Sequence, residues 1–567
     1  MNLGVDFGST YSVISTYRKE YDRVEALELQ QSSPYLPTEV CLKKGQYNFG
    51  RAAKSMAGQK GLRSFRGFKM LLSEEDADIR RGRGFDGEAG EENSPEAITE
   101  KYLSHMFREA MSSYAAEAID ELVICAPEIW SQGIRTIDAR TKLSEICRRM
   151  DFVKDQNVRV VSEPAAASAY FAFNFWKSTG NFYEGNILLV DYGGGTLDIT
   201  LTNVHTRERE GGGVGMEIKV LERTGAGENE EGRIGKAGIV FMETLAEEAI
   251  LASGLPFEAA QLRQDPGFYK FVNELEDQLQ SQTETITDIY NQYDKYDAEE
   301  FREDIDEEED EFVTLYFKGS EVVIRYSHML DVYNREIRGV LQENLSKMIA
   351  YMDRGQIPYM DKEQDNFKIA LVGGFGNFFL VKQQVEETFA WSASFDRRSE
   401  GIILVKGDRE KAVSMGAALL ADHVVDIQNT APYSIGIFAL SGGEPVYIYA
   451  FTRRQNIELD VPYYPKKEDG SDCLYLVGGI DKFILESEEY PAGQVVRIRE
   501  ELRERMRQIN RNNMPTFGII GFSLDSAEVL HLHMRRYDLI RKAVREDEEE
   551  IDIPLTRLNE LFDPILF

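Results

Sequence analysis

Two segments far apart in this 567-residue chain carry the same short pattern, and this internal repeat restricts the folds open to the sequence. The first is LGVDFGST (3–10), and the second is LLVDYGGGT (188–196). In each segment an apolar strand ends at an aspartate, a glycine-rich turn follows, and an alternating second strand begins. The repeat predicts two lobes of similar design that face each other across a cleft.

Strand and helix patterns alternate between and beyond the two repeats, which favours α/β lobes. A third glycine-rich turn, GGFGN (373–377), follows another apolar strand. The many Gly and Glu residues of 211–235 predict a mobile loop. The acidic run 297–311, with eleven acids, is interpreted as a solvated insertion or helix end, because the spacing of an EF-hand calcium loop is missing. The other predicted elements are strands at 122–126 and 158–161 and helices at 134–150, from 164, at 378–389 and at 411–421.

The pattern changes after about residue 423. Short alternating strands separated by Gly, Pro and Asp turns replace the α/β pattern, and one Arg-rich helix interrupts them. We therefore expect a two-lobed domain over 1–422, a linker over 423–431 and a β-rich domain over 432–567. Within the first domain, lobe I is expected to span about 1–180 and 390–422, and lobe II about 186–389.

Composition excludes several classes of protein. A net charge of −33 argues against binding to nucleic acid or an anionic membrane, because both would repel the chain. The N-terminus lacks the pattern of a signal peptide, and the longest apolar stretch is too short to span a bilayer, so we expect a soluble, cytoplasmic protein. The two histidines at 531 and 533 lack a third metal ligand. The cysteines lack zinc or disulfide spacing and are expected to be reduced and mostly buried: Cys41, Cys125, Cys147 and Cys473.

Glycine-rich turns at strand ends present backbone N–H groups to a shared point, which suits phosphate oxygens. Hydroxyl groups of Ser9, Thr10 and Thr196 can add donors. The aspartates would repel phosphate unless a hard cation lies between them, so the pattern implies Mg²⁺ held largely through water. Lys69 can neutralise charge that develops during phosphoryl transfer. Two matched turns plus a third favour a nucleotide site, whereas a P-loop, a dinucleotide fingerprint and a GxSxG elbow are all missing.

These turns resemble the phosphate and adenosine motifs of the actin-like ATPases, and the chain is most similar to the seventy-kilodalton heat-shock (DnaK-type) chaperones. The segment VVSEPAAASAY (160–170) is similar to a characteristic helix start of that family. Further similar segments are LPTEV (36–40), FGRAAK (49–54) and KAVSMGAA (411–418). The resemblance covers about 1–422 and continues weakly through 431–436. It implies the actin-like, ribonuclease-H-like two-lobed fold, followed by a domain that resembles a lidless β-rich substrate-binding domain.

The resemblance also implies roles for individual residues. Lys69 matches the lysine that contacts the γ-phosphate and the attacking water, and Thr10 and Thr196 match phosphate-contacting threonines. Pro127 and Arg135 resemble a pair that relays nucleotide state to the linker. The expected catalytic residues are Lys69, Glu163, Asp191 and Thr196, and the expected metal-arranging acids are Asp6, Asp191 and Asp198. The expected nucleotide-binding residues are Asp6, Gly8, Ser9, Thr10, Tyr11, Gly193, Gly194, Gly195, Thr196, Gly373, Gly374 and Phe375.

Departures from the family concern the adenine end of the site. The family's adenine-gripping helix carries a Lys-Arg pair and a Ser, whereas the nearest stretch here is NELEDQLQ (273–280). The Ser and Arg of the adenosine motif are lost in GGFGN, where Phe375 could stack on the purine, and the second-lobe turn IGKAG (234–238) lacks its acids. The resulting hypothesis is an Mg-dependent ATPase with ATP/ADP as ligand, coupled to a peptide client and to co-chaperones. The alternatives are a non-catalytic nucleotide-sensing scaffold and, more weakly, a filament-forming actin relative or a small-molecule kinase.

Overall fold

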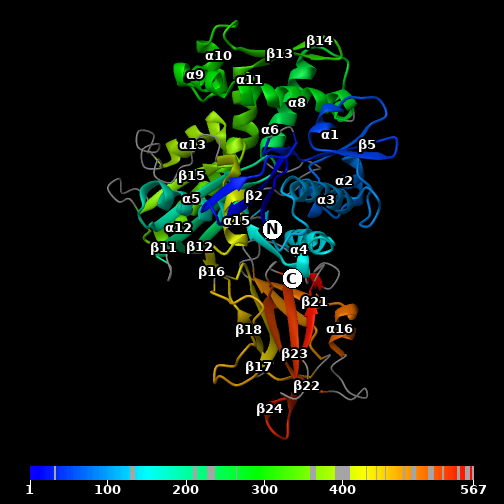
Figure 1. Ribbon diagram of the computed structural model, residues 1–567, viewed down its shortest axis with the longest axis vertical. Coiled ribbons are helices and arrows are strands. Elements are labelled where there is room, and N and C mark those ends of the chain that lie inside the picture. The colour runs from blue at the N-terminus through cyan, green and yellow to red at the C-terminus, as the bar shows by residue number, and fades with distance from the viewer. Residues whose placement is uncertain are drawn as a thin grey trace.

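The computed structural model is an elongated molecule in which two α/β lobes stand above a β-rich domain (Figure 1). It describes the whole chain except residues 31–32, 128–129, 131–133, 209–213, 227–236, 264, 358–365, 390–408, 429–430, 442–443, 454, 477–478, 487–492, 508–515, 526–528, 546–549, 556–561 and 565–567.

Lobe I is built on a mixed sheet in which the first repeat forms a hairpin. Strand β1 (Asn2–Phe7) pairs antiparallel with β2 (Tyr11–Arg18) and parallel with β8 (Glu121–Ala126). The sheet order is β3-β2-β1-β8-β9, and β4 pairs with β2. The remaining strands are β3 (Arg23–Ala26), β4 (Leu36–Pro37) and β9 (Val158–Ser162). A three-stranded sheet beside it contains β5 (Glu39–Lys43), β6 (Gln46–Phe49) and β7 (Arg63–Arg66).

Two long helices of lobe I begin where the sequence supplies both a cap and a proline. Ser94 caps α3 (Pro95–Ser113) and Ser162 caps α5 (Glu163–Thr179); each hydroxyl accepts a backbone N–H, and Pro fills the first turn. The first turn of α5 therefore fixes Glu163 at the end of β9. The other helices of this lobe are α1 (Arg51–Ser55), η2 (Met70–Leu72), α2 (Ala77–Gly82), α4 (Ile134–Arg148), η4 (Lys154–Gln156), η7 (Arg409–Lys411) and α15 (Ala412–Ala421).

Lobe II repeats the same sheet plan with the second repeat. Strand β10 (Glu184–Tyr192) pairs antiparallel with β11 (Leu197–Glu208) and parallel with β15 (Phe367–Val372). The loop prediction for 211–235 is wrong over β12 (Val214–Ala226), which pairs with β11 along nearly its whole length. Apolar residues alternate through this strand, and that periodicity outweighs the Gly and Glu residues on either side.

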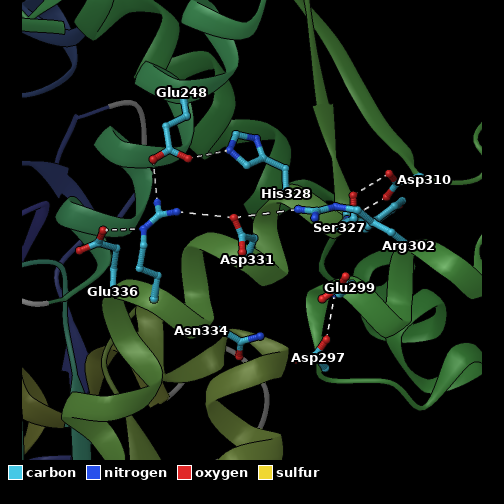
Figure 2. A network of polar contacts seen from close by, with 12 residues as sticks. Glu248, Asp297, Glu299, Arg302, Asp310, Ser327, His328, Asp331, Asn334 and Glu336 are labelled. Atoms are coloured by element: carbon cyan, nitrogen blue, oxygen red, sulfur yellow. Dashed lines mark hydrogen bonds and ion pairs between the residues drawn. The ribbon is translucent and has the colours of Figure 1, made fainter.

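Helices and a small hairpin complete lobe II (Figure 1). The helices are α6 (Gly238–Ala252), α7 (Ala259–Leu262), α8 (Pro266–Ser281), α9 (Thr283–Tyr293), α10 (Ala298–Asp304), α11 (Tyr326–Tyr333), η5 (Asn334–Arg338), α12 (Gly339–Arg354), η6 (Phe375–Asn377) and α13 (Phe379–Phe389). The hairpin contains β13 (Glu311–Phe317) and β14 (Ser320–Arg325). The acidic run is largely exposed, and Asp297 caps α10. Figure 2 shows the neighbouring network, in which Glu248 accepts from His328 and from Arg335.

Helix α15 locks the two ends of the first domain together. A Cβ atom on Gly416 would lie 1.6 Å from the carbonyl oxygen of Ala166 in α5. A Cβ atom on Gly4 in β1 would lie 2.0 Å from the backbone nitrogen of Ala418. Only glycine permits either approach, because real Cβ atoms never come so close to a neighbouring backbone. Lobe I is therefore completed by residues some 400 positions after its first strand.

The β-rich domain is a sandwich of two antiparallel sheets. One sheet has the order β18-β17-β20-β21-β26 and the other β19-β22-β23-β24, with β25 on β23. The predicted Arg-rich helix is α16 (Glu500–Arg507), which buries Leu502 and Met506. The strands are β17 (Ser434–Ser441), β18 (Glu444–Phe451), β19 (Tyr475–Leu476), β20 (Lys482–Glu486), β21 (Gln494–Ile498), β22 (Phe517–Leu524), β23 (Leu530–Asp538), β24 (Ala543–Val544), β25 (Ile551–Pro554) and β26 (Phe562–Pro564). These sheets confirm the predicted fold class, a two-lobed α/β unit followed by a β-rich region.

Part of the segment between the domains is a strand. Residues Asp426–Gln428 form β16, which pairs parallel with β12 and so extends the sheet of lobe II. All four cysteines are buried and free, as predicted. Within the ranges described above, no helix combines the length and apolar character needed to cross a membrane.

Candidate functional site

A cleft of about 990 Å³ lies between the lobes, and both sequence repeats open into it. Each hairpin turn joins a buried strand to its antiparallel partner, so the turns stand at the edges of the two sheets that face the cleft. The predicted residues that line this cavity are Asp6, Gly8, Ser9, Thr10, Tyr11, Lys69, Glu163, Asp191, Gly193, Gly194, Gly195, Thr196, Gly373, Gly374 and Phe375.

The two glycine-rich turns lie against each other. A Cβ atom on Gly194 would lie 2.3 Å from the Thr10 hydroxyl oxygen, and one on Gly195 would lie 2.4 Å from that of Ser9. The turns of both lobes thus present hydroxyl and backbone groups to one point. This arrangement suits a chain of phosphate groups, which needs several converging donors.

Beneath the turns lies a buried cluster of acids around a single lysine. Lys69 is 2% exposed, and its Nζ lies 2.5 Å from Glu163 Oε1. Burial alone would lower the pKa of Lys69, but the negative charges of Glu163 and Asp6 outweigh burial and raise it. The lysine is therefore a permanent cation of the cleft floor, held by the carboxylate at the start of α5.

The acids of this cluster carry more negative charge than Lys69 can balance. Burial raises the pKa of Asp6 to about 7, with Glu163 adding to the rise and Lys69 opposing it. Burial, followed by Glu163 and Asp6, raises the pKa of Asp191 well above its usual value. Asp198 lies opposite Asp191 in the β10–β11 register, fully buried behind the cleft lining. The excess negative charge of this cluster would be stabilised by a bound cation.

The residues fit a hydrated magnesium ion better than a directly chelated one. Among the residues that the structure describes, no group of three or more His, Cys, Asp or Glu is arranged to hold a metal by itself. Carboxylates that act through water, together with the phosphates of a nucleotide, suit Mg²⁺, which keeps several of its waters when bound.

The third glycine turn forms an aromatic wall of the cleft. The Phe375 ring is stacked on Phe378 with centroids 5.4 Å apart, and it meets Tyr192 edge-on at 5.2 Å and Phe241 at 5.3 Å. Phe375 is thus fixed in position by its neighbours while it lines the cavity. Stacking of this ring on a purine stays a prediction.

Comparison with known proteins finds relatives of the N-terminal part of the chain, which contributes most of this site. The sequence model of the family described as Hsp70 protein matches residues 2–210. The chain is 27% identical over 228 residues to heat shock cognate 70 kDa protein 3 of Dictyostelium discoideum, and 26% identical over 223 residues to a heat shock 70 kDa protein of Ajellomyces capsulatus. Over this segment the chain is similar to Hsp70 proteins.

The match with these Hsp70 proteins is partial. A third relative, a heat shock 70 kDa protein of Trichophyton rubrum, is 25% identical over 223 residues. Each of the three alignments covers 36% of this chain and only about a third of the relative, namely 34%, 29% and 32%. The Hsp70 match contains both phosphate turns, Lys69 and the acid cluster. The resemblance predicted for the rest of 1–422 stays a prediction.

The part of the site that departs from the Hsp70 pattern is helix α8. Its cleft face carries acids, and Lys54 of lobe I reaches across to them, with Nζ 3.7 Å from Glu276 Oε2 and 3.1 Å from Asp277 Oδ1. Lys54 also donates to the Tyr11 hydroxyl at 2.8 Å. The sequence does not predict this bridge, because nothing local signals a pairing between residues about 220 positions apart.

A second unexpected feature of α8 is Asn273. Its side chain is 5% exposed and lines the cleft, yet within the described part of the chain neither its amide nitrogen nor its amide oxygen has a hydrogen-bond partner. Buried amides in folded proteins are nearly always paired, so an amide with both atoms free indicates a place for a ligand.

The predicted Hsp70 relay is only partly described. Pro127 is buried directly after β8. Arg135 lies in the first turn of α4, but its side chain, like residues 128–129 and 131–133, falls outside the described part of the structure. Residues 234–236 of the second-lobe turn also fall outside it, whereas Ala237 is the N-cap residue of α6 and Gly238 is its first residue.

Proposed function

We propose that this protein binds ATP in the cleft and hydrolyses it, as a chaperone-like member of the Hsp70 family. The observation that carries the proposal is the meeting of two glycine-rich turns, one from each lobe, directly above the buried Lys69–Glu163 pair. The turns supply converging donors for phosphates, and the pair supplies a fixed cation beside a carboxylate. The partial length of the match makes the whole activity a proposal.

The reaction that fits this geometry is attack of water on the γ-phosphate. Lys69 stabilises negative charge on the transferring phosphoryl group, since it is buried and already oriented. Glu163 or Asp191 orients the water or accepts its proton, because both acids line the same floor. Thr10 and Thr196 donate to phosphate oxygens. Asp6, Asp191 and Asp198 would hold a hydrated Mg²⁺, which when bound supplies charge neutralisation at the phosphates.

The first test is turnover by the purified full chain. We expect ATP hydrolysis that depends on Mg²⁺, and calorimetric titrations of ATP, ADP and GTP that show binding in the presence of the metal. A complete lack of Mg-dependent turnover would disprove the ATPase proposal. Binding without turnover would favour the alternative, a nucleotide-sensing scaffold. The observation behind that alternative is the altered α8 face, where acids tied to Lys54 stand in place of cations.

Metal affinity is expected to depend on pH through Asp6. Because the pKa of Asp6 is about 7, a proton competes with Mg²⁺ below that pH and leaves above it. For one such group, Mg²⁺ affinity of the ADP complex should rise about tenfold from pH 6 to pH 8. Titration calorimetry of wild type and of Asp6→Asn measures this. The difference between the two proteins isolates Asp6 from titration of the nucleotide, and equal pH profiles would contradict the prediction.

Asn273 is expected to bind the nucleoside part of the ligand. Replacing it by leucine removes an unpaired buried amide, so the nucleotide-free protein should gain about 1–2 kcal/mol in unfolding free energy. The same change should weaken ADP binding about fivefold or more by removing the hydrogen bonds, and leave tripolyphosphate binding unchanged. Urea unfolding and calorimetry give both values.

A matched control for this variant is Asn344→Leu. Asn344 is also buried in a helix, but its amide is satisfied by Thr224 at 2.7 Å and by the Val340 carbonyl at 2.9 Å. That variant should lose stability, since Thr224 would be left unpaired. If Asn273→Leu loses stability to the same extent, the amide is not free and the assignment fails.

We further propose that the β-rich domain responds to the nucleotide and binds an extended peptide or protein client. Support comes from β16, through which the linker joins the sheet of lobe II, and from Arg453, whose guanidinium lies 3.7 Å from Glu222 of β12. A change in the angle between the lobes would therefore reach the β-rich domain. Co-chaperones are the other expected partners. Equal affinity of a labelled peptide in ATP and in ADP would contradict this coupling.

A further inference from the structure

The β-rich domain meets lobe I at a second joint, distant from the linker. Asp525, in the turn after β22, forms an ion pair with Arg148 at the end of α4, with 2.8 Å between Oδ2 and Nη1. The same carboxylate accepts the backbone N–H of Val529 at 2.8 Å. Val529 is 3% exposed and belongs to the apolar core of lobe I, although it lies in the β-rich domain. The β-rich domain thus contacts lobe I through the buried Val529 side chain and the Asp525–Arg148 ion pair.

His531 lies inside this joint and shares the carboxylate with Arg148. Its Nε2 is 3.6 Å from Asp525 Oδ2, and its Nδ1 is 2.8 Å from Asp552 Oδ1 on β25. Asp460, whose backbone N–H donates to the Leu524 carbonyl, adds a third carboxylate that interacts with the same group. Three acids therefore surround one permanent cation and one titratable cation.

A further neighbour of His531 is His533, on the same strand. His533 is stacked on His531 with ring centroids 6.1 Å apart, and it faces Ser523 at 2.7 Å and Glu550 at 2.7 Å. Within the described ranges, no group of three or more His, Cys, Asp or Glu side chains is placed to hold a metal ion.

The surroundings shift the pKa values of His531 and Asp525 in opposite directions. Burial would lower the pKa of His531, but hydrogen bonds to Asp525 and Asp552 outweigh burial and raise it above its ordinary value. Burial would raise the pKa of Asp525, but His531 and Arg148 together lower it. His531 therefore keeps its proton to a higher pH than an ordinary imidazole, whereas Asp525 stays ionised to a lower pH than an ordinary carboxyl group.

We propose that His531 is a proton-controlled competitor for Asp525, so that protonation of its ring releases the β-rich domain from lobe I. The sign follows from the contacts. Docking brings the Arg148 guanidinium to the carboxylate that the imidazolium already neutralises. This second positive charge disfavours the charged ring, so docking expels its proton, and the docked fraction rises with pH.

Small-angle scattering of the full chain between pH 6 and pH 8.5, at constant ionic strength, tests the proposal. We expect the ratio of docked to undocked molecules to rise about fivefold over this range, a typical coupling for two linked sites. His531→Gln should stay docked at every pH, because it carries no charge. His531→Lys should stay largely undocked, and His205→Gln, a change of an exposed lobe II histidine, should behave as wild type.

Two controls keep the result decisive. Arg148→Ala should undock at every pH while its β-rich domain melts at the wild-type temperature, which separates docking from folding. Wild-type pH dependence in His531→Gln, or a docked fraction that falls as pH rises, would overturn the proposal. The measurement uses no nucleotide, so its outcome does not depend on the proposed ATPase activity.

Discussion

Replacing Lys69 by alanine is expected to reduce ATP turnover about 100- to 1,000-fold while nucleotide affinity changes only a few-fold. The size follows from loss of one preorganised cation at a site where charge develops during the reaction. Lys69 is fixed in that position by Glu163 and is buried in the floor of the cleft. Single-turnover hydrolysis and ADP calorimetry measure the two quantities separately.

A matched variant for this test is Lys54→Ala. Lys54 also lines the cleft, but it bridges to Glu276 and Asp277 on α8 instead of facing the acid cluster. Its loss should change nucleotide release and leave single-turnover chemistry within a few-fold. Removal of Lys69 also leaves Glu163 unpaired in a buried position, so thermal melting must show that Lys69→Ala is folded. A folded Lys69→Ala that retains wild-type turnover contradicts the mechanism.

Replacing Gly416 by alanine is expected to destabilise the first domain by about 3 kcal/mol or more. The new methyl group would lie 1.6 Å from the Ala166 carbonyl oxygen, so α15 and α5 must separate, and backbone atoms cannot rotate away as a side chain can. The damage spreads to the site, because α5 begins with Glu163. Urea unfolding followed by circular dichroism gives the change in unfolding free energy.

Gly339→Ala provides the opposite control. Gly339 starts α12 and has nothing within 4 Å of its added Cβ. Alanine there should stabilise the protein by about 0.5–1 kcal/mol, since it restricts the unfolded chain and favours the helix. If both glycine variants unfold at the same urea concentration, the close approach of α15 to α5 is not what holds lobe I together.

The sequence was most informative where local patterns set the structure. The strand–Asp–Gly repeats predicted both hairpins and their shared cleft, because an apolar run and a glycine turn are visible without a partner. The start of α5 at Ser-Glu-Pro was equally predictable, because a capping serine and a first-turn proline are local signals that lie within four residues of each other. Strand β12 was missed because glycine and glutamate residues on both sides obscured its alternation.

The parts that could not be predicted depend on contacts between distant residues. Nothing near Lys54 reveals that Glu276 will face it, and nothing near Asn273 reveals that its amide will be buried without a partner among the described residues. Arg148 and Asp525 look like ordinary surface charges, yet they form the joint between domains. Such features depend on how whole lobes pack, which no short pattern encodes.

The placement of α15 has a consequence for synthesis. Strand β1 leaves the ribosome before α15, because the helix that packs on it at Gly4 is made about 400 residues later, a delay of roughly 20–80 seconds at about 5–20 residues per second. During that delay the chain can complete the lobe II sheet, apart from β16, whereas β1 and α5 each lack their α15 neighbour. Newly made lobe I therefore exposes the surfaces that α15 later covers, and we expect chaperones to bind these surfaces until α15 emerges.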